Sequence, residues 1–134
     1  MAEKTIFTLI IEGEIPSHKI YEDDKTLAFL DIHPAQPGHT LVVPKTQVDH
    51  IWDLSDDDYQ AVMKTTKVVA NHLREQLAVK RVGVQVLGLD VPHAHVHLIP
   101  FNTTAEFRNV PDQSAQPDHA KLAEMAEKLK MENN

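Results

Sequence analysis

The chain has 134 residues, of which 42% are apolar, so it is long enough for one compact domain with a substantial buried core. Thirteen basic against twenty acidic side chains give a formal charge of -7, which disfavours electrostatic binding to nucleic acid or to an anionic membrane. The sequence contains no cysteine, which excludes disulfides, a cysteine nucleophile and cysteine-rich zinc sites.

The first residues lack the apolar stretch of a secretory signal, and no apolar run approaches the length of a membrane-spanning helix. We therefore expect a single domain over residues 1–134 that works in the cytoplasm, without a membrane or nucleic-acid partner. A small phosphorylated ligand is compatible with the negative charge, because local hydrogen-bond donors can hold a phosphate against the overall field.

Residues 1–15 are expected to form a short helix or helical turn, because apolar residues cluster there before Gly13 interrupts the pattern. Two strands should follow at 18–22 and 27–31, separated by a turn at 23–25 whose short polar side chains favour it. His18, His72 and His119 lie in polar surroundings and are expected to be ordinary surface residues.

A third, largely buried strand is predicted at 40–44, after a loop made rigid by prolines. A long helix should come next, since residues 54–58 supply an N-cap and an acidic first turn. Residues at helical spacing then indicate its buried face: Tyr59, Val62, Thr66, Val69, Leu73 and Leu77. This helix should lie across the sheet.

A fourth strand is predicted where valines alternate with other residues from 81 to 86, so that Gln85 faces away from the valines. A turn at 88–90 would return the chain antiparallel into a fifth strand at 92–100. Residues 102–116 are polar and irregular, and Pro117 begins a last helix. Most connections are too short for a parallel crossover, which predicts an α+β fold: a five-stranded antiparallel sheet, one long helix, and short N- and C-terminal helices.

The predicted fifth strand reads Pro-His-Ala-His-Val-His-Leu-Ile-Pro and places three histidines at alternate positions. Residues two apart in a strand share one face, spaced about 6.6 Å along it. We therefore expect His93, His95 and His97 to line one face, while Val96 and Leu98 pack into the core.

Three uses of this histidine pattern remain open from the residues alone. A neutral imidazole at His95 can attack phosphorus and form a phosphorus–nitrogen intermediate, with His93 and His97 as donors to the phosphate or the leaving group. The same pattern can hold zinc, because neighbouring imidazoles can converge on one cation and leave a position for water. A structural or surface role is the third reading.

Several separated segments resemble the histidine triad (HIT) superfamily. Residues 92–100 match its His-φ-His-φ-His-φ-φ signature, and residues 5–16, 21–24, 27–32 and 37–45 are similar to the Hint-like branch, which is of the nucleoside phosphoramidase type. The resemblance covers about residues 5–100, the core of a single HIT domain. The tail and helix at 101–134 lie outside it.

The resemblance implies roles for four histidines. His95 matches the nucleophile that forms a covalent nucleotidyl intermediate, oriented by the backbone carbonyl of His93. His97 matches the histidine that contacts the phosphate and assists the leaving group, and His39 matches a fourth histidine beside the triad. From the residues alone, His39 is equally well an exposed residue at a strand end.

The resemblance also implies a nucleotide pocket. Asp31 matches the carboxylate that accepts hydrogen bonds from both ribose hydroxyls, although the residues alone favour a turn-capping aspartate there. Gln85 matches an amide that reaches the phosphate. The residues that match the apolar walls around the base are Ile6, Phe7, Ile10, Phe29 and Ile32, each of which taken singly is compatible with a place in the core.

The chain departs from the family at two places. Asp90 stands where relatives carry a hydroxyl that contacts the phosphate, so either this carboxylate turns outward or the leaving-group side of the pocket differs. Thr5 and Thr8 occupy the places of two cysteines that bind structural zinc in some bacterial relatives, although His50 and His93 remain. Hydroxyls are poor zinc ligands, so we expect neither a metal nor another cofactor.

The expected function is therefore hydrolysis of nucleoside 5′-monophosphate derivatives, with a purine nucleotide phosphoramidate as substrate, by a homodimer in which two five-stranded sheets join. One alternative is a dinucleoside polyphosphate hydrolase, since residues 37–39 also resemble the Fhit branch. The others are a nucleotide-binding regulatory protein with little catalysis and a metal-binding β protein.

Overall fold

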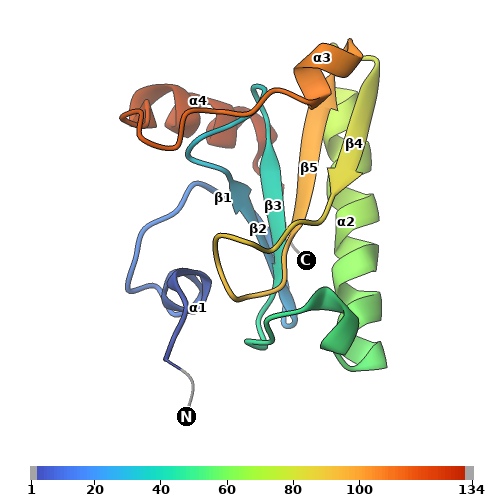
Figure 1. Cartoon of the computed structure of the whole chain (residues 1–134). Coiled ribbons are helices and arrows are strands. Elements are labelled where there is room, and N and C mark those ends of the chain that lie inside the picture. The colour runs from blue at the N-terminus through green and yellow to red at the C-terminus, as the bar shows by residue number, and fades with distance from the viewer. Residues whose placement is uncertain (1–2, 132–134) are drawn as a thin grey trace.

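The computed structural model describes residues 3–131, which contain one five-stranded sheet (Figure 1). Its strands are β1 (Lys19–Glu22), β2 (Thr26–Leu30), β3 (Thr40–Pro44), β4 (Arg81–Gln85) and β5 (Val96–Phe101). They lie in the order β1-β2-β3-β5-β4, and every neighbouring pair is antiparallel. The predicted α+β class and sheet are confirmed.

The helices are α1 (Ile6–Ile11), α2 (Asp56–Gln76), α3 (Thr104–Phe107) and α4 (His119–Leu129), with a 3-10 turn at Ile51–Asp53. Helix α2 begins as predicted, because the Ser55 hydroxyl accepts a hydrogen bond from the Asp58 N–H. Helix α3 lies in the segment that was expected to be irregular. Its local signal is a capping box between Thr103 and Glu106, which the sequence contains.

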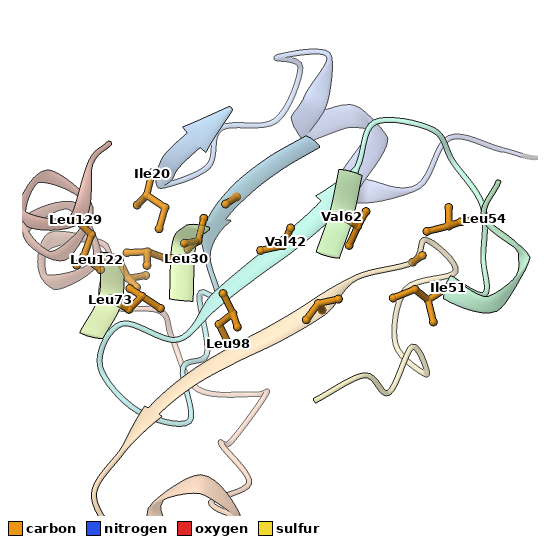
Figure 2. Close-up of a cluster of buried hydrophobic side chains, with 14 residues drawn as sticks. Ile20, Leu30, Val42, Ile51, Leu54, Val62, Leu73, Leu98, Leu122 and Leu129 are labelled. Atoms are coloured by element: carbon orange, nitrogen blue, oxygen red, sulfur yellow. The ribbon is translucent and has the colours of Figure 1, made fainter. Parts of the chain in front are cut away.

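Helices α2 and α4 cover one face of the sheet and form the larger core with it. Figure 2 shows Leu73 of α2 beside Leu122 and Leu129 of α4, with Leu30 of the sheet next to them. The Leu129 carbonyl also lies 2.8 Å from His72 Nε2, which ties α4 to α2. Burial of these apolar side chains is the main stabilising contribution on this face.

The two remaining histidines of the expected surface set are not isolated. Nε2 of His18, just before β1, lies 3.0 Å from Nδ1 of His119, the first residue of α4, and their rings stack. This contact joins residues 101 positions apart and lies at the surface, where these histidines were expected.

The opposite face of the sheet is covered by α1 and carries a smaller apolar cluster. Its buried members are Phe7, Leu27, Phe29, Leu41 and Val43. The Phe7 ring meets Phe29 edge to face, with centroids 5.5 Å apart. This contact seats the short helix on β2.

The histidine block is only partly a strand. Strand β5 begins at Val96, and the preceding residues belong to the loop that returns from β4, at the same end of the sheet as α1 (Figure 1). The Ala94 N–H donates to the Val48 carbonyl at 2.7 Å, and the His93 N–H donates to the Val91 carbonyl at 2.8 Å. These backbone donors are used within loops, so the strand predicted for 92–100 is shorter than expected.

Strand β4 forms an open edge of the sheet, and Val84 on it is 50% exposed.

Among residues 3–131, none of the helices is long and apolar enough to span a membrane.

Candidate active site

The strand register places one row of side chains across the face that α1 covers. Phe29 pairs with Leu41, Leu41 with His97, and His97 with Gln85. Directly paired residues point to the same side of a sheet. Gln85 therefore lies next to His97 on this face. Leu41, which sequence reasoning did not single out, lies on this face between Phe29 and His97.

His95 is held in one orientation by a backbone carbonyl. Its Nδ1 lies 2.7 Å from the carbonyl oxygen of His93, which can only accept, so Nδ1 carries the proton. The neutral ring then keeps its lone pair on Nε2. The Phe7 ring meets the imidazole edge to face at 5.0 Å and 83°, and His95 is 5% exposed. These contacts restrict rotation of a potentially nucleophilic nitrogen.

His97 owes its protonation pattern to His39. The Ala35 N–H donates to His39 Nδ1 at 2.9 Å, which places the proton of neutral His39 on Nε2. This Nε2–H in turn donates to His97 Nδ1 at 2.9 Å, so neutral His97 carries its proton on Nε2. Burial lowers the pKa of both His39 and His97 to about 4. Near neutral pH, His97 is therefore an uncharged donor whose ring centre lies 5.0 Å from that of His95.

His93 differs from the other two triad histidines because its ring is fully buried and both its nitrogens are used. Nε2 donates to the Pro44 carbonyl and Nδ1 accepts from the Thr5 hydroxyl, each at 2.8 Å. Burial also lowers the pKa of His93. The His93 ring lies against Phe7, as the His95 ring does, but both its nitrogens have partners within the protein, so it does not offer the donor to a ligand that was expected. Its backbone carbonyl contacts His95 as the resemblance implied.

Asp31 lies at the end of β2, beside the two linked histidines. Its Oδ1 accepts from the His33 N–H at 2.8 Å, which is the turn-capping arrangement that the residues favour. Its Oδ2 lies 3.6 Å from His39 Nε2. Burial raises the pKa of Asp31, while the His33 N–H and the charge that His97 can carry oppose that rise. The carboxylate thus offers an acceptor at the rim of the histidine cluster.

The residues expected around a base are only partly brought together. Phe7 and Phe29 are buried and in contact, and Ile10 packs against their cluster. Ile6 lies on α1 and is 48% exposed. Ile32 is 42% exposed and lines a cavity of about 500 Å³ between the loop after β2 and α4.

Asp90 lies exposed in the loop between β4 and β5. Its negative charge is among the influences that raise the pKa of His97, although burial outweighs it. The side chain therefore acts on the cluster at a distance, and no hydrogen bond joins the two residues in the described part of the chain.

Metal binding fits the observed triad poorly. In the described part of the chain, the group of histidine and acidic side chains close enough to share an ion is Asp31, His39 and His97, with ligand atoms within 4.8 Å of one another. Its two imidazoles are already hydrogen bonded to each other. The triad rings do not converge, since both His93 nitrogens have other partners.

The cysteine positions of zinc-binding relatives do not fit a metal here either. Thr5 and Thr8 lie with Gln47 beside His93, while His50 is exposed. Hydroxyl and amide oxygens are poor zinc ligands, and the hydroxyls here already serve as hydrogen-bond donors.

Comparisons with known proteins identify the family of this chain. The family model of the HIT domain matches residues 12–104. The purine nucleoside phosphoramidase of Escherichia coli K12 is 37% identical over 106 residues, covering 74% of this chain and 88% of that protein. An adenosine 5′-monophosphoramidase of Candida albicans is 35% identical over 136 residues, covering 95% and 90%. The crystal structure of a Hit-like protein from Bartonella henselae superimposes with a TM-score of 0.82 at 29% identity, covering 96% of each chain. The chain therefore belongs to the HIT family.

Proposed function

We propose that this protein hydrolyses purine nucleoside 5′-phosphoramidates, with His95 Nε2 as the nucleophile and the cytoplasm as the place of the reaction. The observation that carries the proposal is the 2.7 Å hydrogen bond from His95 Nδ1 to the His93 carbonyl, which leaves Nε2 as a restrained lone pair. Relatives whose names state phosphoramidase activity, at 35% to 37% identity, support the substrate class.

In the first step, His95 Nε2 forms a bond to the α-phosphorus, and the bond from phosphorus to the amine breaks. The positive charge on the modified imidazole is stabilised by the Nδ1–H that donates to the His93 carbonyl. The amine leaves with a proton from His97, whose protonation a bound phosphate anion favours. Asp31 also raises the pKa of His97 and so stabilises this transient charge.

In the second step, water attacks the same phosphorus and the bond to His95 breaks. His97 takes the proton of that water, which restores both histidines and releases the nucleoside monophosphate. No group other than water and the chain's own residues is needed to balance this cycle.

The rest of the site suits a nucleotide. The Asp31 carboxylate at the rim can accept from ribose hydroxyls, and Gln85 beside His97 can donate to a phosphoryl oxygen. Phe7 and Phe29 offer an apolar surface to the base, extended by exposed Ile6.

A homodimer is part of the proposal. Strand β4 is an edge with unpaired backbone groups on its outer side, and half-exposed Val84 and Val86 add apolar surface beside it. Pairing of two such edges would join the two sheets, as the family resemblance implies. Sedimentation velocity of the wild type and of Val84→Lys tests this: we expect a dimer in the first and a monomer in the second.

The decisive experiment measures release of adenosine monophosphate from adenosine phosphoramidate by chelator-treated protein. His95→Ala should lower the rate about a thousandfold or more, because nothing else supplies the nucleophile. His119→Ala, which removes a histidine of α4 away from the triad, is the matched control and should keep the rate.

Two further readouts separate the alternatives. A diadenosine polyphosphate assayed alongside identifies a polyphosphate hydrolase if it is cleaved faster. Single-turnover trapping of the nucleotide on the protein should label the wild type and leave His95→Ala unlabelled. Nucleotide binding without release or label would instead identify a binding protein with little catalysis.

A further inference from the structure

The threonine before α1 ties this helix to the first triad histidine. The Thr5 hydroxyl lies 2.8 Å from His93 Nδ1 and accepts from the Thr8 N–H at 3.1 Å. Because His93 Nε2 already donates to the Pro44 carbonyl, Nδ1 of the neutral ring must accept, and Thr5 must donate. Thr5 is therefore at once the N-cap of α1 and the donor to a fully buried imidazole.

Gln47, in the loop after β3, holds the two threonines from the other side. Its Oε1 accepts from the Thr5 N–H at 2.9 Å and from the Thr8 hydroxyl at 2.6 Å. Its Nε2 donates to the Glu3 carbonyl at 2.8 Å. Each hydroxyl proton is thus used once, from Thr8 to Gln47 and from Thr5 to His93, and the three side chains form one consistent network.

His93 transmits this restraint to the nucleophile through two contacts. Its carbonyl accepts from His95 Nδ1, and Phe7, two residues after Thr5, packs its ring edge to face against both imidazoles at 5.8 and 5.0 Å. A shift of Thr5 would therefore move both the carbonyl that orients His95 and the ring that flanks it.

We propose that Thr5 is a positioning residue: its hydroxyl holds His93 in the orientation that directs the His95 lone pair outward. The kinetic part of this inference rests on the proposed function, whereas the orientation of the two imidazoles does not. Where the family resemblance implies a zinc ion bound by cysteines in some relatives, this chain uses hydrogen bonds of Thr5, Thr8 and Gln47 to hold the N-terminal helix against the triad.

The test compares three threonine variants. Thr5→Val keeps the shape and removes the hydroxyl, Thr5→Ser keeps the hydroxyl, and Thr66→Val is the matched control. Thr66 is as buried as Thr5, but its hydroxyl donates to the Val62 carbonyl within α2, remote from the triad. Two properties are measured: kcat and KM for adenosine phosphoramidate, and the exchange rate of the His95 Nδ1 proton with water, followed by NMR without substrate.

Thr5→Val should lower kcat about 10- to 100-fold, because small misplacements of a reacting atom are costly, and should accelerate the proton exchange. Its KM should stay within about twofold of wild type, because the hydroxyl is not a substrate contact. Thr5→Ser should restore most of kcat and slow exchange, and Thr66→Val should change neither.

A folded Thr5→Val protein with wild-type kcat and proton exchange would overturn the proposal. If the wild type hydrolyses no phosphoramidate, the proposed function fails, and the exchange comparison of Thr5→Val with Thr66→Val still decides whether Thr5 positions His95. If Thr5→Val does not fold, Thr8→Val takes its place, since it removes the 2.6 Å bond to Gln47 and leaves the Thr5–His93 bond. For Thr8→Val, we expect the His95 Nδ1 proton to exchange faster than in the wild type, but by less than is expected for Thr5→Val. An unchanged exchange rate in Thr8→Val would contradict the proposal.

Discussion

The two faces of the sheet bury side chains for different purposes. Among residues 3–131, the face under α2 and α4 contributes to a core of fourteen buried apolar residues, whereas the α1 face buries five and adds His39, His95 and the partly buried His97 beside them. Neighbouring residues of one strand serve opposite faces, as with His97 and Leu98. Because burying polar groups costs free energy, the large apolar core can offset the cost of the polar site on the other face.

The largest expected effect separates stability from activity. Leu73→Ala removes a fully buried side chain of α2 and should lower the free energy of unfolding by about 2–5 kcal/mol. Below the melting temperature its kcat and KM should stay close to wild type, because Leu73 belongs to the core on the other face. Urea titration and phosphoramidate kinetics measure the two quantities.

Leu41→Ala is the counterpart on the α1 face, where this leucine lies between Phe29 and His97. It should lower stability by a similar amount and also raise KM, since the wall beside the histidine is lost. If Leu73→Ala and Leu41→Ala changed KM equally, this would contradict the view that only the α1 face contributes to the site.

Acid should weaken the fold mainly through the α1 face. Burial lowers the pKa of His39 and of His97 from 6.5 to about 4, so the unfolded chain binds protons at a higher pH than the folded one. Their contribution is complete above pH 6.5 and is lost as the pH falls from 6.5 to 4. The raised pKa of Asp31 acts in the opposite sense, but His93 adds to the histidine effect.

Urea midpoints at pH 7 and pH 5 check this prediction. The midpoint should be lower at pH 5, and His39→Gln should reduce the difference because one buried titrating ring is gone. The same pH dependence in both proteins would assign acid sensitivity to groups outside the site.

Local signals in the sequence were sufficient for much of the fold. Strand β3 has the predicted bounds, and α2 begins at the predicted cap, because an apolar run and an N-cap depend on neighbouring residues. The short α3 was missed although its capping box at Thr103 is also local.

The site depended on contacts that no local pattern contains. The ring of His93 turns inward because Thr5 and Pro44, 88 and 49 positions away, supply its two partners. Alternation alone therefore did not reveal that both nitrogens of this histidine have partners within the protein. Leu41 acquires its place between Phe29 and His97 only from strand register, which depends on how distant segments align.

A smaller effect is expected from a glycine that shapes the edge of the site. Gly38 has φ of 90° just before His39, and an added Cβ would lie 2.7 Å from Leu77 Cδ1. Gly38→Ala should therefore cost about 1–3 kcal/mol and lower kcat by moving His39. Gly13→Ala is the matched control, because Gly13 has φ of 81° with nothing within 4 Å of the added carbon.

The pair separates backbone strain from displacement of the site. Gly13→Ala should lower the free energy of unfolding only by the cost of an alanine at positive φ. Its kcat should equal that of the wild type. If both alanine variants keep kcat, the turn at Gly38 does not control the position of His39.

The smallest effect concerns Asp90, which acts on His97 as an exposed charge and not through a direct contact. Asp90→Ser should raise kcat/KM for phosphoramidates about 1.4- to fivefold, because an exposed carboxylate near a bound phosphate repels it by only about 0.2–1 kcal/mol. The gain should shrink at high salt, which screens exposed charges. Asp24→Ser removes the same charge from the turn between β1 and β2 and should leave the kinetics unchanged. Equal kinetics for Asp90→Ser and wild type at low salt would mean that this side chain turns away from the phosphate and has no direct part in substrate preference.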